Sequence, residues 1–122
     1  MTVEEKIRHW MHGREDELVE ALAPLIAAES TRSEAKPGMP FGEGPAMALD
    51  RALELAQRLG IPMSEVMTLG DNDNDIPMLA CAGYGVAMAN ATPGALAAAK
   101  YRTTRFDEYG VAAAIEKYVL KA

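Results

Sequence analysis

The sequence predicts an α/β fold in which a small parallel sheet with packed helices follows a mostly helical first half. In the second half, short apolar runs alternate with helix-forming segments, as in parallel strands joined by helices. In the first half, apolar residues recur three and four positions apart, as in amphipathic helices. The 122 residues are 49% hydrophobic and 25% charged, which is typical of an ordinary globular domain.

Three helices and one long loop are expected in the first half. Apolar spacing predicts helices over residues 3–12 and 16–28, and Pro24 is expected to strain the second if it is unbroken. The stretch STRSEAKPGMPFGEGP has three prolines and three glycines, which predicts a loop over residues 29–44. Pro45 suits the first turn of a third helix over residues 45–59, which Gly60 ends.

The second half is expected to alternate strands with helices. Glycines at positions 70 and 83 mark the ends of a strand and of a short helix. The pattern predicts strands over residues 65–69, 85–88 and 101–103, and helices over 76–82, 92–99 and 109–120. We therefore expect a helical segment over residues 1–60 and an α/β segment over residues 61–122.

Composition narrows the range of partners and compartments. Twelve Lys and Arg against 18 Asp and Glu give a formal charge of -6, which disfavours nucleic acid and anionic membranes as partners. No apolar run approaches the roughly 20 residues that span a bilayer. Cys81 is the only cysteine, so it cannot form an internal disulfide, and it lies in an expected apolar helix. The N-terminal residues are too polar for a secretory signal. We expect a cytoplasmic protein with Cys81 as a buried thiol.

Three carboxylates directly after the first expected strand are the strongest sign of chemistry. In open parallel sheets, ligands bind beyond the carboxyl ends of the strands, where Gly70-Asp71-Asn72-Asp73-Asn74-Asp75 would lie. Acids this close repel one another unless a cation, a helix N-terminus or water relieves their charge. Carboxylate and amide oxygens suit Mg²⁺. The alternative is a structural turn in which Asn74 or Asp75 caps the next helix.

A calcium loop of the EF-hand kind is excluded by the residues that follow. That loop requires glycine at its sixth position and an acid at its twelfth. Counted from Asp71, those positions hold Ile76 and Ala82.

The segment EVMTLGDNDNDIPMLACAGYGVAMANA resembles the C-terminal signature of the haloacid dehalogenase superfamily, in particular its Cof-type phosphatases. The similarity continues through TPGALAAAKYRTTRFDEYGVAAAIEKYVL and covers about residues 60–120. It implies a Rossmann-like sheet and Mg²⁺-dependent hydrolysis of phosphate monoesters of small molecules.

The resemblance also implies roles for individual residues. Asp71 would bind Mg²⁺, with Asp75 in or near the metal shell. Asn74 would contact the transferred phosphate, and Asn90 is a further candidate for substrate contact. Asp73 occupies a variable position of the motif and is interpreted as solvated surface.

The sequence departs from the family in the groups that attack and hold the phosphate. The family uses an aspartate nucleophile in an early D-x-D-x-T motif, and no such motif occurs here. No lysine lies between Lys36 and Lys100, so the phosphate-binding lysine has no counterpart ahead of the acidic motif. We therefore expect no catalytic residue and no turnover by this chain alone.

The first half shows a second resemblance. HGREDELVEALAPLIAAES and EAKPGMPFGEGPAMALDRALELAQRLG resemble the N-terminal segment of zinc dipeptidases related to acetylornithine deacetylase, over about residues 3–60. A zinc hydrolase needs about three protein ligands and an open water position. His9 and His12 share a helical face, but no acid at ligand spacing completes a set, so a surface helix is favoured.

Two partial resemblances that meet near ALELAQRLG predict a chimera with incomplete cores, which homo-oligomerisation would cover. The predicted function is that of an Mg²⁺-dependent phosphatase lineage without its nucleophile. The alternatives are a non-catalytic fragment that binds metal, phosphate or a partner, and a zinc dipeptidase fragment.

Overall fold

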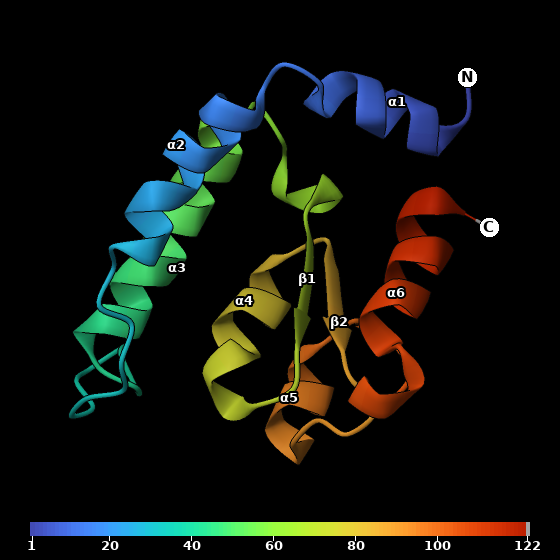
Figure 1. The fold of residues 1–122 in the computed structure, drawn as a ribbon. Helices are drawn as coiled ribbons and strands as arrows, with labels where there is room; N and C mark the ends of the chain where they lie inside the picture. Colours follow the sequence, from blue (N-terminus) through green and yellow to red (C-terminus); the bar gives the residue numbers. More distant parts are fainter. Residues whose placement is uncertain (122) are drawn as a thin grey trace. The chain divides into compact units, whose positions relative to one another are not determined.

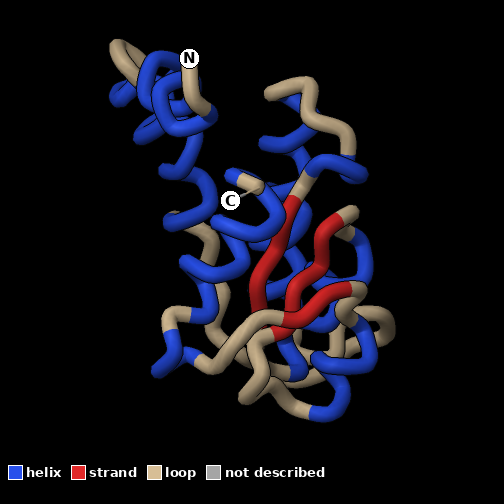
Figure 2. The backbone as a smooth tube through the Cα atoms, turned by 90° about the vertical axis from the view of Figure 1, so that its right-hand side faces the viewer, coloured by secondary structure: helices blue, strands red, loops and turns tan. Residues whose placement is uncertain are grey.

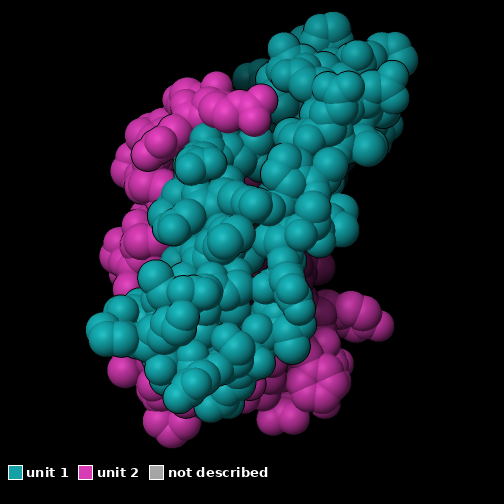
Figure 3. Space-filling model, turned by 90° about the vertical axis from the view of Figure 1, so that its left-hand side faces the viewer, with its two compact units in different colours: residues 1–55 teal, residues 56–122 magenta. Residues whose placement is uncertain are grey.

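The computed structural model describes residues 1–121. The chain forms two compact units, Met1–Leu55 and Ala56–Ala122, which are coloured separately in Figure 3. Each unit is described by itself.

The first unit is built from helices (Figure 1). Helices α1 (Val3–Met11) and α2 (Glu15–Ile26) lie within it, and α3 (Glu43–Arg58) runs across its boundary. These bounds confirm the three predicted helices to within two residues. The strain expected at Pro24 does not break α2, which continues through that residue to Ile26.

Local hydrogen bonds explain where α1 starts and how the end of α2 is held. The Thr2 hydroxyl accepts from the amide of Glu5 at 3.1 Å, and the Glu5 carboxylate accepts from the amide of Thr2 at 2.6 Å. This reciprocal cap satisfies two amides that the first helical turn leaves unpaired. Near the end of α2, Arg51 Nη1 donates to the carbonyl of Pro24 at 2.7 Å.

The loop between α2 and α3 is fastened to the start of α3 by an ion pair. Lys36 pairs with Met39 in an isolated antiparallel bridge, and Lys36 Nζ lies 2.7 Å from Glu43 Oε1. The Lys36 ammonium, through this hydrogen bond and its charge, lowers the pKa of the Glu43 carboxyl below its usual value.

Replacing Lys36 should raise the pKa of Glu43. In Lys36→Met the carboxyl loses its donor and its neighbouring cation, so its pKa returns toward the ordinary value. The stabilisation from the pair is present above the unfolded pKa of Glu43 and is lost as pH falls through the lowered folded pKa. Carboxyl ¹³C NMR titration measures this shift. Lys6→Met is the control, and equal Glu43 titrations in wild type and Lys36→Met would refute the pairing.

The second unit contains a three-stranded parallel sheet. Its strands are β1 (Met67–Gly70), β2 (Tyr84–Ala87) and β3 (Tyr101–Arg102), in the order β1-β2-β3. Helices α4 (Ile76–Cys81) and α5 (Pro93–Ala98) connect them, and α6 (Gly110–Ala114) continues as a π-helix over Ile115–Leu120. The predicted α/β fold with parallel strands and a helical first half is confirmed.

The core of this unit lies between α4, α5 and the sheet. Leu79 and Val86 are fully buried, and a side chain at Gly85 would overlap the carbonyl group of Leu79. Glycine at position 85 therefore lets α4 pack directly on β2. The prediction that Cys81 is buried is wrong: it is the last residue of the short α4, and its thiol is exposed.

Three tyrosines form an aromatic cluster at the amino ends of β2 and β3. The rings of Tyr84 and Tyr101 stack with centroids 5.4 Å apart, and Tyr118 lies 5.1 Å from Tyr101. The opposite, carboxyl ends of the strands are left to polar loops. Within residues 1–121, no helix is both long and apolar enough to cross a membrane.

Apolar side chains are exposed on the first two helices. Trp10 is 47% exposed, Val19 66% and Ile26 81%. Because such surface is costly to hydrate, we expect the chain to self-associate. Sedimentation at micromolar concentration should show a species larger than the monomer, and Val19→Lys with Ile26→Lys should shift it toward the monomer. A clean monomer of the wild-type chain would contradict the expected homo-oligomer.

Candidate functional site

The acidic loop lies at the carboxyl end of the sheet. Because the three strands are parallel, the loops that follow them share one edge (Figure 2). Two backbone hydrogen bonds hold the loop after β2 at this edge: Met88 N donates to Gly70 O, at the end of β1, at 3.0 Å, and Ala89 N donates to Thr104 O, in the loop after β3, at 3.3 Å. The loop after β2 therefore lies next to the end of β1 and to the loop after β3.

The carboxylate of Asp75 organises the loop after β1. Its Oδ2 accepts from the backbone amides of Asp71 at 2.9 Å and Asn72 at 3.2 Å. Asn72 Oδ1 in turn accepts from the amide of Asp73 at 2.8 Å, and a 3₁₀ turn, η2, spans Asp73–Asp75. The turn leads straight into α4, so one acid closes the loop and the others are left at the surface.

Gly70 makes this closure sterically feasible. A Cβ at position 70 would lie 2.5–2.7 Å from the Cβ, Cγ and Oδ2 atoms of Asp75. These separations are well below van der Waals contact. The last residue of β1 must therefore lack a side chain for the Asp75 carboxylate to reach the two amides.

Thr92 joins the acidic loop to the loop that follows β2. Its amide donates to the carbonyl of Asp71 at 3.0 Å, and its hydroxyl donates to Asp73 Oδ1 at 2.6 Å. The same hydroxyl accepts from the amide of Ala95 at 3.3 Å and so caps α5. Asp73 is exposed, as predicted, but the interpretation of it as purely solvated surface is incomplete.

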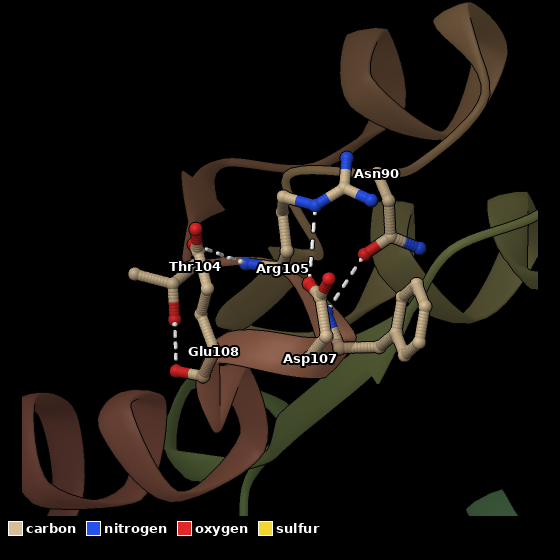
Figure 4. Close-up of polar contacts among 6 residues, drawn as sticks. Asn90, Thr104, Arg105, Asp107 and Glu108 are labelled. Atoms are coloured by element: carbon tan, nitrogen blue, oxygen red, sulfur yellow. Dashed lines mark hydrogen bonds and ion pairs between the residues drawn. The ribbon is translucent and has the colours of Figure 1, made fainter.

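Asn90 faces the loop that follows β3 (Figure 4). Its Oδ1 accepts from the amide of Phe106 at 3.0 Å, at the start of the 3₁₀ turn η3 (Phe106–Glu108). Arg105 Nε lies 3.1 Å from Asp107 Oδ1, and the Thr104 hydroxyl donates to the Glu108 carbonyl at 3.0 Å. The oxygen of the Asn90 amide is thus occupied, which leaves its NH₂ group to donate elsewhere.

The predicted site residues come from two adjoining loops. Asp71, Asn74 and Asp75 lie on one loop, and Asn90 lies two residues before Thr92, which contacts that loop. His9 and His12, by contrast, are exposed and belong to α1 and its C-terminal end in the first unit. Within residues 1–121 there is no group of three or more His, Cys, Asp or Glu placed to hold a metal ion.

The oxygen atoms on the acidic loop are of the type that a hard cation prefers, but the loop supplies only part of a coordination shell. Asp71 and Asp75 offer carboxylate oxygens, the ligand type that Mg²⁺ prefers, and Mg²⁺ commonly takes one or two carboxylates and keeps several waters. Both oxygens of Asp75 have partners already: Oδ2 accepts from two backbone amides, and Oδ1 accepts from Asn74 Nδ2 at 3.5 Å. The loop can therefore hold Asp71 and Asp75 toward Mg²⁺ as part of a shell.

Sequence patterns missed Gly70 and Thr92 as residues that shape the site. The pair Thr92-Pro93 is a recognisable helix start, because threonine caps helices and proline suits their first position. That signal could have marked Thr92 as a cap. Nothing in the sequence pairs it with Asp73, which lies 19 residues away.

A family model of haloacid dehalogenase-like hydrolases matches residues 50–115, more than half of the chain. The chain belongs to this family. The matched range holds the acidic loop, Thr92 and Asn90, and it confirms the resemblance of the second half.

Individual relatives agree with this family. The chain is 55% identical over 67 residues to YxeH of Bacillus subtilis, covering 55% of this chain and 25% of YxeH. It is similar to the structure of BT4131, described as a sugar phosphatase of HAD subclass IIB. The two are 34% identical with a TM-score of 0.55, and the match covers 67% of this chain and 30% of BT4131. BT1666 of Bacteroides thetaiotaomicron, a phosphatase of the same superfamily, matches at 30% identity over 86% of this chain and 39% of its own, with a TM-score of 0.58.

The extent of these matches bears on the other predictions. This chain spans about a quarter to two fifths of the length of these three relatives. The similarity to BT1666 covers 86% of this chain, which is a larger share than the second unit alone, so it extends into the helical first half. These comparisons give no support to a dipeptidase-like first half, so the chimera stays a prediction.

Gly70→Ala should disrupt the loop by displacing Asp75. Forcing a side chain into this contact should destabilise the protein by about 1–3 kcal/mol. Thermal or urea unfolding of Gly70→Ala, Asp75→Ala and the double variant measures the coupling between the two sites. Since the clash needs the Asp75 side chain, Gly70→Ala should cost clearly less in the Asp75→Ala background. Equal costs in both backgrounds would show that the clash is not with Asp75.

Proposed function

We propose that this chain supplies the magnesium- and phosphate-binding part of a phosphate-monoester hydrolase. The chain belongs to the haloacid dehalogenase-like hydrolases, whose phosphatases typically use Mg²⁺. The observation that carries the proposal is the position of Asp71, Asn74 and Asp75 on one closed loop at the carboxyl end of β1.

Each predicted residue has a role that its surroundings support. Asp71 would ligate Mg²⁺ through its exposed carboxylate, and Asp75 would support the metal shell while fixing the loop. A phosphate offers only acceptor oxygens, so amide groups must donate to it. Asn74 would donate its NH₂ group, and the Asn90 amide is oriented for the same task because Phe106 engages its oxygen.

The reaction itself would need groups that these 122 residues do not contain. Hydrolysis through an aspartyl-phosphate needs a nucleophilic aspartate, and the sequence has no D-x-D-x-T motif. We propose that the nucleophile and a cationic phosphate-binding group come from a segment outside this sequence. Alone, the chain would bind Mg²⁺ and phosphate without turnover.

The substrate class follows from the relatives and the composition. BT4131 is described as a sugar phosphatase, and the excess of acidic residues disfavours a nucleic acid substrate. We propose a small phosphorylated metabolite as the substrate and a reducing, cytoplasmic setting for a chain with one exposed, unpaired cysteine, Cys81.

Magnesium titration tests the proposed function. Adding MgCl₂ to the ¹⁵N-labelled chain should shift the amide resonances of Asp71–Asp75, and inorganic phosphate added afterwards should shift Asn74 and Asn90. Asp71→Asn keeps the shape of the side chain but removes its charge, so it should weaken Mg²⁺ binding about tenfold or more.

A turnover assay separates the binding role from full catalysis. With p-nitrophenyl phosphate and Mg²⁺, the wild-type chain should release no more product than Asp71→Asn. Turnover above that control would show that the chain holds a complete site. An unchanged spectrum up to millimolar Mg²⁺ would refute the metal-binding role.

A further inference from the structure

We propose that Thr92 and Asp73 are positioning residues that hold the magnesium ligand Asp71 in place. This inference rests on the proposed function, and it concerns two residues to which the family motif assigns no role. Its basis is a set of hydrogen bonds between the loop after β1 and the loop after β2.

The backbone of Asp71 is held on both sides. Its amide donates to Asp75 Oδ2 at 2.9 Å, within the acidic loop. Its carbonyl accepts from the amide of Thr92 at 3.0 Å, from the neighbouring loop. Because its amide and its carbonyl are held by two different loops, the backbone position of Asp71 and the direction of its Cα–Cβ bond are set by the fold.

The side chains of Thr92 and Asp73 reinforce the second of these contacts. The Thr92 hydroxyl donates to Asp73 Oδ1 at 2.6 Å, a short hydrogen bond to a charged acceptor. Asp73 Oδ1 also lies 3.0 Å from where a Cβ on Gly94 would stand, so the carboxylate fits closely against the start of α5. We name the Thr92–Asp73 hydrogen bond the loop latch.

Because of the loop latch, the three carboxylates of the acidic loop differ in their hydrogen-bond partners. Asp75 accepts two backbone amides and Asp73 accepts the Thr92 hydroxyl. Within residues 1–121, the structure gives the Asp71 carboxylate no hydrogen bond, and the residue is exposed. The latch therefore engages Asp73 with Thr92, so Asp71, with Asp75 supporting it, is the carboxylate left without a hydrogen bond to meet a cation.

Four variants test the latch in two matched pairs. Asp73→Ala and Asp73→Asn both remove the charge, but only asparagine keeps an oxygen for the Thr92 hydroxyl. Thr92→Val and Thr92→Ser differ in the hydroxyl, which serine retains. The Asp73 pair leaves the cap of α5 intact, so it separates the latch from the capping role of Thr92.

The first readout is Mg²⁺ affinity, from MgCl₂ titrations of the full chain followed at the Asp71 amide resonance. Asp73→Ala should bind about fivefold more weakly than Asp73→Asn, and Thr92→Val about tenfold more weakly than Thr92→Ser. The second readout needs no metal: hydrogen exchange of the Thr92 amide should be faster in Asp73→Ala and Thr92→Val than in their partners.

Equal affinities and equal exchange rates within both pairs would overturn the latch while leaving Mg²⁺ binding by the wild-type chain intact. If the wild-type chain binds no Mg²⁺, the proposed function fails instead, and the exchange rates alone decide whether the latch anchors Asp71. Slower or unchanged exchange in Asp73→Ala relative to Asp73→Asn would then overturn it.

Discussion

The candidate site depends on one carboxylate that accepts two backbone amides. By accepting from the amides of Asp71 and Asn72, Asp75 turns the chain sharply after β1, and α4 begins at the next residue, Ile76. The amides are unpaired donors where the strand ends, and an anionic acceptor satisfies them more strongly than a neutral one. Without a side chain at Gly70 this geometry is accessible, so the strand end, the turn and the helix start form one unit.

The fold could be predicted because it rests on local patterns. The strands β1 and β2 are short apolar runs bounded by glycine or polar residues, and the helices have apolar residues at helical spacing. The differences between prediction and structure at Pro24 and Cys81 also have local causes. Pro24 lies in the last turn of α2, so its missing amide removes one helical hydrogen bond, to the Glu20 carbonyl, only two residues before the helix ends. The helix α4 is so short that Leu79 is its one buried residue. Burial of Cys81 could not be inferred from an apolar neighbourhood alone.

The site residues were predictable as a motif, but their connections were not. Asp71, Asn74 and Asp75 stand together in the sequence, so a pattern can find them. The bonds from Thr92 to Asp73 and from Phe106 to Asn90 join residues 19 and 16 positions apart. Such pairs depend on the register of β1, β2 and β3, which the apolar runs do not fix.

Acidic residues gather at the carboxyl edge of the sheet and affect how the proposed ligands, Mg²⁺ and phosphate, would bind. Asp71, Asp73 and Asp75 lie on the loop after β1, and Asp107 and Glu108 lie on the loop after β3. Arg105 is the cation on the latter loop, and it is already paired with Asp107, whereas the Lys100 ammonium donates to the Ala82 carbonyl near the opposite end of the strands. The loops after β1 and β3 therefore offer a phosphate mainly acids and amides, whereas Arg102, the last residue of β3, is exposed and forms no ion pair within residues 1–121. Because like charges repel, we expect a divalent cation that offsets the acids at this edge to strengthen the binding of phosphate there.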